Sequence, residues 1–137
     1  MKKMTTTERR RLRKLEKFLP TVYREKFDME IYVSAMFCLP HQAKKILSDC
    51  GTSACAIGWA AYLFPELSAK AHSFDFLASE LFGIDFFDDE WEFLFSQDWS
   101  LNYNSPEFAA RRINLYLEKG LPSYWHHSTA ESEWEWL

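Results

Sequence analysis

The stretch that decides the fold is SACAIGWAAYLF, residues 53–64, which is followed directly by Pro65. Its residues are apolar or small in every direction around a helix axis, and such a helix lies inside a domain rather than on its surface. We therefore expect a buried central helix over 53–64, capped by Thr52 or Ser53. Gly58 in its middle costs about 1 kcal/mol relative to alanine, which predicts that another backbone or a large ring packs closely there.

Further helices are expected on both sides of this central one, because apolar residues recur at helical spacing and start and stop signals flank them. Gly83 is a left-handed helix stop, and Ser105 with Pro106 is a start signal that combines an N-cap with proline at the first helical position. The predicted helices cover residues 6–19, 74–82, 88–95 and 105–120, with a short helix or turn at 41–47.

Residues 22–39 permit two interpretations. Ile31, Val33 and Phe37 alternate with other side chains, as in a strand, but the intervening positions are also largely apolar, which favours a buried helix. We therefore expect an all-α fold, or a mainly α fold with a short hairpin near 22–39. In either case the chain forms a compact bundle of five or six helices around 53–64.

Length and composition predict one domain without a membrane span. The chain has 137 residues, of which 47% are hydrophobic and 24 are aromatic. We expect a single domain over 1–137, with a basic N-terminal helix (6–19), a helical body (20–120) and a Trp-rich C-terminal tail (121–137). No apolar run reaches the roughly 18 residues of a membrane span, and no apolar core of a signal peptide follows the first lysines.

The net charge of −4 combines two regions of opposite sign. Residues 1–26 contain ten Lys or Arg and three Glu, a balance of +7, whereas the other 111 residues have a balance of −11. The basic segment can contact phosphate, an acidic partner or the acidic body of its own chain, and we favour the last. An acidic body repels nucleic acid, so binding to nucleic acid is not expected except through the basic N-terminal helix.

The three cysteines, Cys38, Cys50 and Cys55, are an odd number in a chain without a secretory leader, which is typical of free thiols in a reducing compartment. None of the four histidines lies at a metal-ligand spacing from them, so we predict no metal and no cofactor.

The motif Cys50-Gly51-Thr52-x-x-Cys55 allows a chemical alternative. The amides at a helix N-terminus favour a thiolate, so Cys50 and Cys55 are candidate catalytic residues of a thiol-dependent enzyme. The amides of Thr52, Ser53 and Ala54 could instead bind a phosphate or carboxylate of a small ligand. We favour a third interpretation, in which both cysteines pack the start of the buried helix.

The acidic segment 85–98 is the candidate partner-binding surface. Its carboxylates alternate with aromatic residues, as in a helix with one solvated face, and also as in a surface that binds a basic partner by charge complementarity. The residues that we expect to contact a partner are Asp85, Asp88, Asp89, Glu90, Trp91, Glu92 and Asp98.

The C-terminal tail carries Trp125, Trp134 and Trp136, which is more large rings than a solvated end requires. Tryptophan is enriched in the centres of protein interfaces, so we expect the tail either to fold back on the body or to join two copies as a homodimer.

Three motifs carry a resemblance to a family. Phe27-Asp28-Met29, Cys50-Gly51-Thr52-x-x-Cys55-x-x-Gly58-Trp59-Ala60 and Leu81-Phe82-Gly83-Ile84 are similar to segments of small uncharacterised proteins of tailed phages, prophages and bacteria. The resemblance implies an accessory protein in the cytoplasm of a bacterial host cell, without a defined activity. We therefore expect a non-enzymatic protein that binds a host protein or complex, such as an inhibitor of a bacterial defence system.

Overall fold

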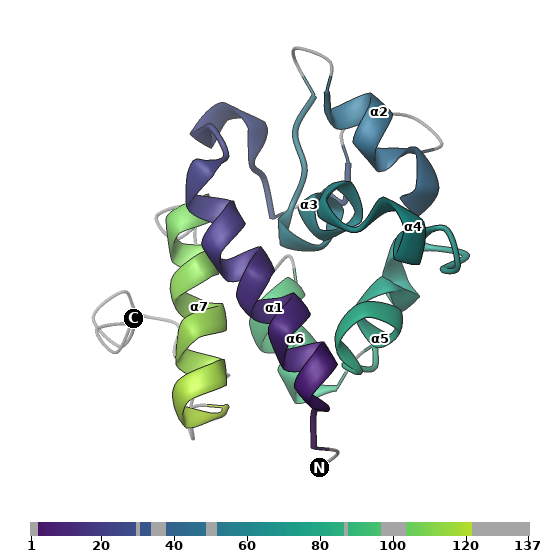
Figure 1. Cartoon of the computed structure of the whole chain (residues 1–137). Helices are drawn as coiled ribbons and strands as arrows, with labels where there is room; N and C mark the ends of the chain where they lie inside the picture. The colour runs from purple at the N-terminus through teal and green to yellow at the C-terminus, as the bar shows by residue number, and fades with distance from the viewer. Residues whose placement is uncertain are drawn as a thin grey trace.

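The computed structural model describes residues 3–29, 31–33, 38–48, 52–86, 88–96 and 104–121. Within these ranges the chain forms seven α-helices joined by short 3₁₀ turns, without a β-strand, which confirms the all-α expectation (Figure 1). The helices are α1 (Thr6–Phe18), α2 (Ala43–Leu47), α3 (Ala56–Leu63), α4 (Pro65–Ser68), α5 (Leu77–Phe82), α6 (Asp89–Phe95) and α7 (Pro106–Lys119). The 3₁₀ turns are η1 (Leu19–Thr21), η2 (Arg24–Lys26), η3 (Pro40–Gln42) and η4 (Phe74–Phe76).

The described residues contain seven α-helices rather than the expected five or six, for two local reasons. Pro65 ends α3 but also begins the short α4, because proline is favoured at the first position of a helix. Residues 41–47, for which the sequence predicts a short helix or a turn, form the end of η3 and the helix α2. None of the described helices is long and apolar enough to cross a membrane.

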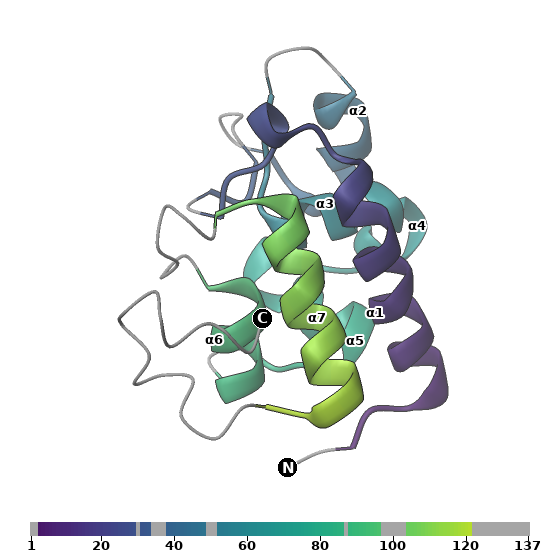
Figure 2. The ribbon, with the colours of Figure 1, turned by 90° about the vertical axis from the view of Figure 1, so that its left-hand side faces the viewer.

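Helix α3 is the centre of the fold. It contacts α1, α2, α4, α5 and α6, and its residues from Ala56 to Ala61 are all buried. The two longest helices, α1 and α7, lie side by side and run in opposite directions, as both ribbon views show (Figures 1 and 2). The continuous apolar stretch of the sequence therefore occupies the position that its composition predicts.

The start of α3 differs from the prediction. The helix begins at Ala56 after Cys55 as its N-cap residue, and neither Thr52 nor Ser53 caps it. The backbone of Ala54 is extended instead, because its amide donates to the Lys26 carbonyl at 3.0 Å and its carbonyl accepts from the Asp28 amide at 3.0 Å. These bonds to a loop hold the chain out of helical geometry.

The described parts of 22–39 form neither the favoured helix nor a hairpin. They contain the turn η2 and two isolated bridges, which pair Phe27 and Val33 with Ala54. The bonds within this segment are short turn bonds, such as that from the Phe27 amide to the Arg24 carbonyl, whereas Lys26, Asp28 and Ile31 bond through their backbones to Ala54 and Cys55. The described residues of the segment therefore form neither a continuous helix nor a self-contained hairpin. Residues 34–37 lie outside the described ranges.

Gly58 shows the close backbone approach that the sequence predicts. A Cβ atom built on Gly58 would overlap the carbonyl oxygen of Tyr32 and lie 2.7 Å from the Cβ of Ala54. The absence of a side chain at Gly58 thus allows the loop around Tyr32 to lie directly on α3.

Gly58→Ala tests this contact. Alanine favours a helix interior by about 1 kcal/mol over glycine, but forcing an extra carbon into packed backbone costs about 1–3 kcal/mol. We expect a net decrease in the free energy of unfolding, measured by urea denaturation. A variant as stable as the parent, or more stable, would contradict the observed packing.

Helix α1 docks on the body through arginines that reach the ends of other helices. Arg9 donates from Nη2 to the carbonyl of Leu117 at 2.9 Å, near the end of α7. Arg11 donates from Nη1 to the carbonyl of Leu81 at 3.1 Å, near the end of α5. The last carbonyls of a helix lack partners within the helix and lie at the negative end of its dipole, so both contacts are favourable.

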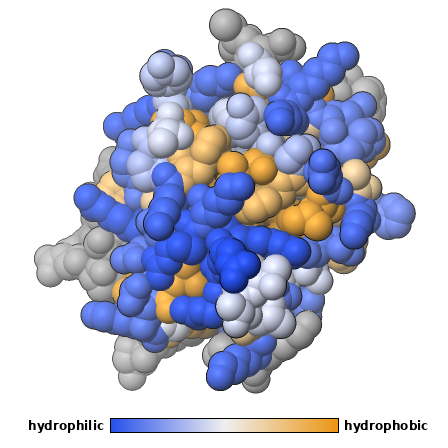
Figure 3. Space-filling model, in the orientation of Figure 1, coloured by the Kyte–Doolittle hydropathy of each residue, from blue (hydrophilic) through white to orange (hydrophobic). Residues whose placement is uncertain are grey.

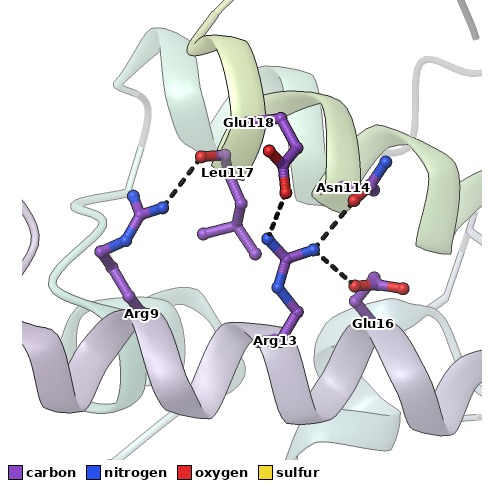
Figure 4. Close-up of polar contacts among 6 residues, drawn as sticks. All are labelled: Arg9, Arg13, Glu16, Asn114, Leu117 and Glu118. Atoms are coloured by element: carbon purple, nitrogen blue, oxygen red, sulfur yellow. Dashed lines mark hydrogen bonds and ion pairs between the residues drawn. The ribbon is translucent and has the colours of Figure 1, made fainter.

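Arg13 joins α1 to α7 through side chains (Figure 4). Its Nη1 donates to Glu16 at 2.8 Å and to Asn114 at 2.9 Å, and its Nη2 donates to Glu118 at 2.9 Å. The basic helix therefore contacts its own body, as favoured from the charge pattern. Its partners include main-chain carbonyls of helix ends as well as carboxylates.

Arg13→Gln is expected to lower the free energy of unfolding by about 1 kcal/mol, because it breaks a network that links two helices. The loss should shrink in roughly 1 M NaCl, where charges in contact with solvent are screened. Arg10→Gln is the matched control, since Arg10 is an exposed arginine of the same helix that does not belong to this network. Equal effects of the two substitutions on thermal unfolding would contradict a specific role for Arg13.

Candidate functional site

The acidic residues of the candidate surface gather where α5 ends and α6 begins. Asp88 is the N-cap residue of α6, and Asp89, Glu90 and Glu92 lie in its first turn. Carboxylates at this end of a helix interact favourably with its dipole. The sequence of α6 therefore places negative charge where the helix itself tolerates it best.

The turn before α6 brings a further carboxylate to the same place. Gly83 ends α5 in the left-handed conformation with φ of 69°, as predicted. Ser79 then donates from Oγ to Asp85 at 3.1 Å, and the Asp88 amide donates to the Asp85 carbonyl at 3.1 Å. These bonds hold Asp85 beside the first turn of α6.

The carboxylates of Asp85, Asp88, Asp89 and Glu90 line a hollow of about 300 Å³, together with Met4 and Tyr116. The first three are exposed and Glu90 is half-buried. The ion pairs in the described part of the chain are those of Arg13, so none of these four carboxylates is ion-paired with a lysine or arginine there. The hollow is a concentrated negative site with an apolar wall.

The environment of the hollow changes the pKa of Tyr116. Partial burial is the largest cause that raises the pKa of its phenol, and the charge of Glu90 raises it further against a smaller opposing effect of Arg9. The phenol therefore stays neutral at physiological pH and offers the hollow a ring face and a hydroxyl.

The aromatic part of the surface differs from the prediction. Trp91 is only 5% exposed, which disagrees with its expected role as a contact residue. It packs edge-on against Phe86, with ring centroids 4.6 Å apart, and so fixes α6 to the turn. Among the described aromatic residues of this region, Phe76 is the exposed one: it is 58% exposed and its ring centroid lies 6.2 Å from that of Phe86.

A signal for Phe76 was present in the sequence. The predicted buried stripe of that helix contains Phe74 and Leu77, and a position between them points away from the stripe. An aromatic residue at such a position is a candidate for binding rather than packing.

Of the other predicted contact residues, Glu92 is half-buried and Asp98 lies outside the described residues.

Behind the surface, α6 is held by buried Arg112 of α7. Its Nη1 donates to the carbonyl of Phe93 at 2.8 Å, and its guanidinium lies 5.2 Å from the centroid of that ring. Burial lowers the pKa of Arg112, and the carbonyl and the ring face compensate part of the cost of burying its charge. This contact orients the acidic end of α6 relative to α7.

The thiol motif has a different environment from the one that a nucleophile requires. Cys55 is 1% exposed, and burial raises its pKa to about 11, although the amides of Gly58 and Ile57 act in the opposite direction. The helix N-terminus thus favours the thiolate, as expected, but desolvation is the larger effect. Cys50 lies outside the described residues, and Cys38 is half-buried with a pKa raised by burial.

The residues expected to bind an anion, Thr52, Ser53 and Ala54, interact with other parts of the fold. The amide of Ala54 donates to Lys26, and the hydroxyl of Thr52 donates to the carbonyl of Ile46 at 2.9 Å. Ser53 is half-buried and takes part in a further interaction. The Ala54 amide is therefore committed to the fold and does not point to a ligand.

Within the described ranges, no group of three or more His, Cys, Asp or Glu side chains is arranged to hold a metal ion. Comparison with protein families, with curated proteins and with solved structures found no match to this chain.

The burial of Cys55 predicts slow chemistry. In a Cys38→Ser/Cys50→Ser background, Cys55 should react with a thiol reagent such as DTNB only as fast as the protein opens, because a protonated, buried thiol is a poor nucleophile. Full labelling in urea is the control. Rapid labelling of the folded protein at neutral pH would contradict a structural role for Cys55.

Proposed function

We propose that this protein is a non-enzymatic accessory protein of phage type, which binds a host protein through the acidic surface between α5 and α6. The observation that carries the proposal is the set of carboxylates at Asp85, Asp88, Asp89 and Glu90, which line one hollow and form no ion pair with a described lysine or arginine. The exposed ring of Phe76 packs against Phe86, the residue after Asp85. The resemblance of the sequence to phage and prophage proteins gives this surface its context.

The charge of the surface indicates the chemistry of the partner. A cluster of carboxylates attracts a basic protein face from a distance and rejects acidic faces and nucleic acid. Basic faces of that kind are typical of proteins that bind nucleic acid. A host nucleic-acid-binding protein, including one of a defence complex, therefore fits the surface best, and occupation of its basic face would inhibit it.

The hollow suggests how a side chain of the partner is bound. An arginine or lysine that enters it would place its charged head among the carboxylates, where charge-assisted hydrogen bonds form. Its aliphatic stem would lie against Met4 and the ring of Tyr116. Phe76 adds an apolar contact outside the hollow, which corresponds to a hydrophobic anchor beside a charged region.

The proposal predicts the behaviour of a charge-neutral variant. The triple substitution Asp85→Asn, Asp88→Asn and Asp89→Asn removes three charges, and asparagine is as well suited as aspartate to the N-cap position 88 of α6. In affinity capture from bacterial lysate, we expect basic proteins bound by the parent to be lost with this variant. Added duplex DNA should compete with the same proteins, because it occupies their basic faces.

The matched control is Glu25→Gln, Glu66→Gln and Glu107→Gln, which removes three charges from exposed glutamates elsewhere. It should retain the captured proteins, and Phe76→Ser should weaken their retention. Equal capture by the parent and by the aspartate variant, with both folded by circular dichroism, would refute the acidic surface as the binding site.

A further inference from the structure

A second surface lies at the other end of α1 from the acidic hollow. A groove of about 360 Å³ runs beside Phe18, Tyr23, Lys26 and Tyr62. Tyr23 on its rim is 73% exposed, the most exposed of the large hydrophobic residues in the described part of the chain. The groove is within the size range of ligand sites in proteins.

The groove is walled by aromatic rings. Phe18 stacks on Tyr62 with ring centroids 5.8 Å apart, and Trp59 meets Tyr62 edge-on at 5.2 Å. The ring of Trp59 is held in place by its Nε1, which donates to the Lys26 carbonyl at 3.0 Å. Trp59 is buried and supports the wall from behind, so the rings that the groove presents are those of half-buried Phe18 and Tyr62, beside exposed Tyr23.

One cation is built into this aromatic wall. Lys26 donates from Nζ to the carbonyl of Leu47 at 2.7 Å, and the same nitrogen lies 5.8 Å from the ring centroid of Trp59. The bond anchors the charge at the end of α2, so the positive charge belongs to the groove rather than to a freely rotating side chain.

A row of basic residues leads along α1 to the groove. Arg10, Lys14 and Lys17 are exposed and follow each other at four- and three-residue spacing, so they share one side of the helix and end next to Phe18. Arg10 and Lys17 make no hydrogen bond or ion pair with the residues that the structure describes, and Lys14 lies 5.4 Å from the ring centroid of Phe64. In the space-filling view, hydrophilic side chains form a band over α1 between apolar patches (Figure 3).

We propose that the groove and the basic row together bind single-stranded nucleic acid. A phosphate backbone complements the charges of Arg10, Lys14 and Lys17, which span about 10 Å of the helix. Unpaired bases can stack on Tyr23 and enter the aromatic groove, and such stacking stabilises single-strand complexes with little dependence on sequence.

The aromatic groove distinguishes this ligand from the alternatives. In a duplex the bases are stacked on each other and offer no free face to a ring, so a duplex would use the basic row alone. An acidic peptide without aromatic residues would likewise satisfy the charges without using the exposed tyrosine and the ring wall. This inference goes beyond the proposed function, since it uses other residues and a ligand of opposite charge.

The test is fluorescence anisotropy with a labelled oligothymidylate of about ten nucleotides. We expect saturable binding near 50 mM salt that weakens towards 200 mM, with a logarithmic slope of about −0.7 for each phosphate contacted. Tyr23→Ala should weaken binding roughly tenfold, because one stacked base is lost. Lys14→Gln/Lys17→Gln should reduce the salt slope by about 1.4.

Lys119→Gln/Arg111→Gln is the matched control, since it removes two exposed cations of α7, and it should leave affinity and slope unchanged. The inference is overturned by an absence of binding near 50 mM salt. Equal affinity for a duplex of the same length, unchanged binding by folded Tyr23→Ala, or tighter binding of an acidic, phenylalanine-containing peptide would also overturn it.

Discussion

The structure depends on a short length of extended chain before α3. Ala54 bonds through both backbone groups to the loop at Lys26 and Asp28, and the next amide, that of Cys55, donates to the Ile31 carbonyl at 3.0 Å. One pair of residues thus joins the loop to the central helix. Because buried amides and carbonyls need partners, this junction determines where α3 begins and keeps the loop on its surface.

Residues next to this junction also bind neighbouring elements of the fold. The Tyr32 side chain hydrogen-bonds to Asp75 and stacks on Phe74 of η4, with ring centroids 5.3 Å apart. Burial, with a further contribution from Asp75, strongly raises the pKa of the Tyr32 phenol, so this donor keeps its proton. On the other side Lys26 reaches the end of α2. The described loop that follows η2 therefore connects α2, α3 and the turn that leads to α5.

Particular residues show which parts of this structure the sequence predicts. Local geometry or composition determines what Ser105, Pro106, Gly83 and the apolar run of α3 do. Ser105 caps α7 by accepting from the Phe108 amide, Pro106 is the first residue of that helix, Gly83 ends α5 and α3 is buried, so these predictions were confirmed. Thr52 and Ser53 carry cap chemistry but do not cap α3, because the partners of the neighbouring Ala54 come from a distant loop. The ambiguity of residues 22–39 has the same cause, since bonds to another segment leave no local pattern.

In the candidate site, too, local features were predictable from the sequence and features that depend on tertiary packing were not. The carboxylates of α6 lie in its first turn as their spacing predicts, whereas burial separates the aromatic residues of the segment. Trp91 faces inward and Phe76, from the preceding helix region, faces solvent. Cys55 shows why a motif alone does not define reactivity: the favourable helix end was predicted, but the degree of desolvation depends on the packing of the complete fold.

The arginine contacts of α1 have a consequence for synthesis of the chain. Arg9 and its acceptor on Leu117 are 108 residues apart in sequence. Helix α1 is therefore synthesised well before the end of α7 that it covers. The apolar side of α1, with Leu12 and Leu15, lacks this neighbour until α7 has been made. The packing of α1 on α7 can be completed only after α7 has left the ribosome.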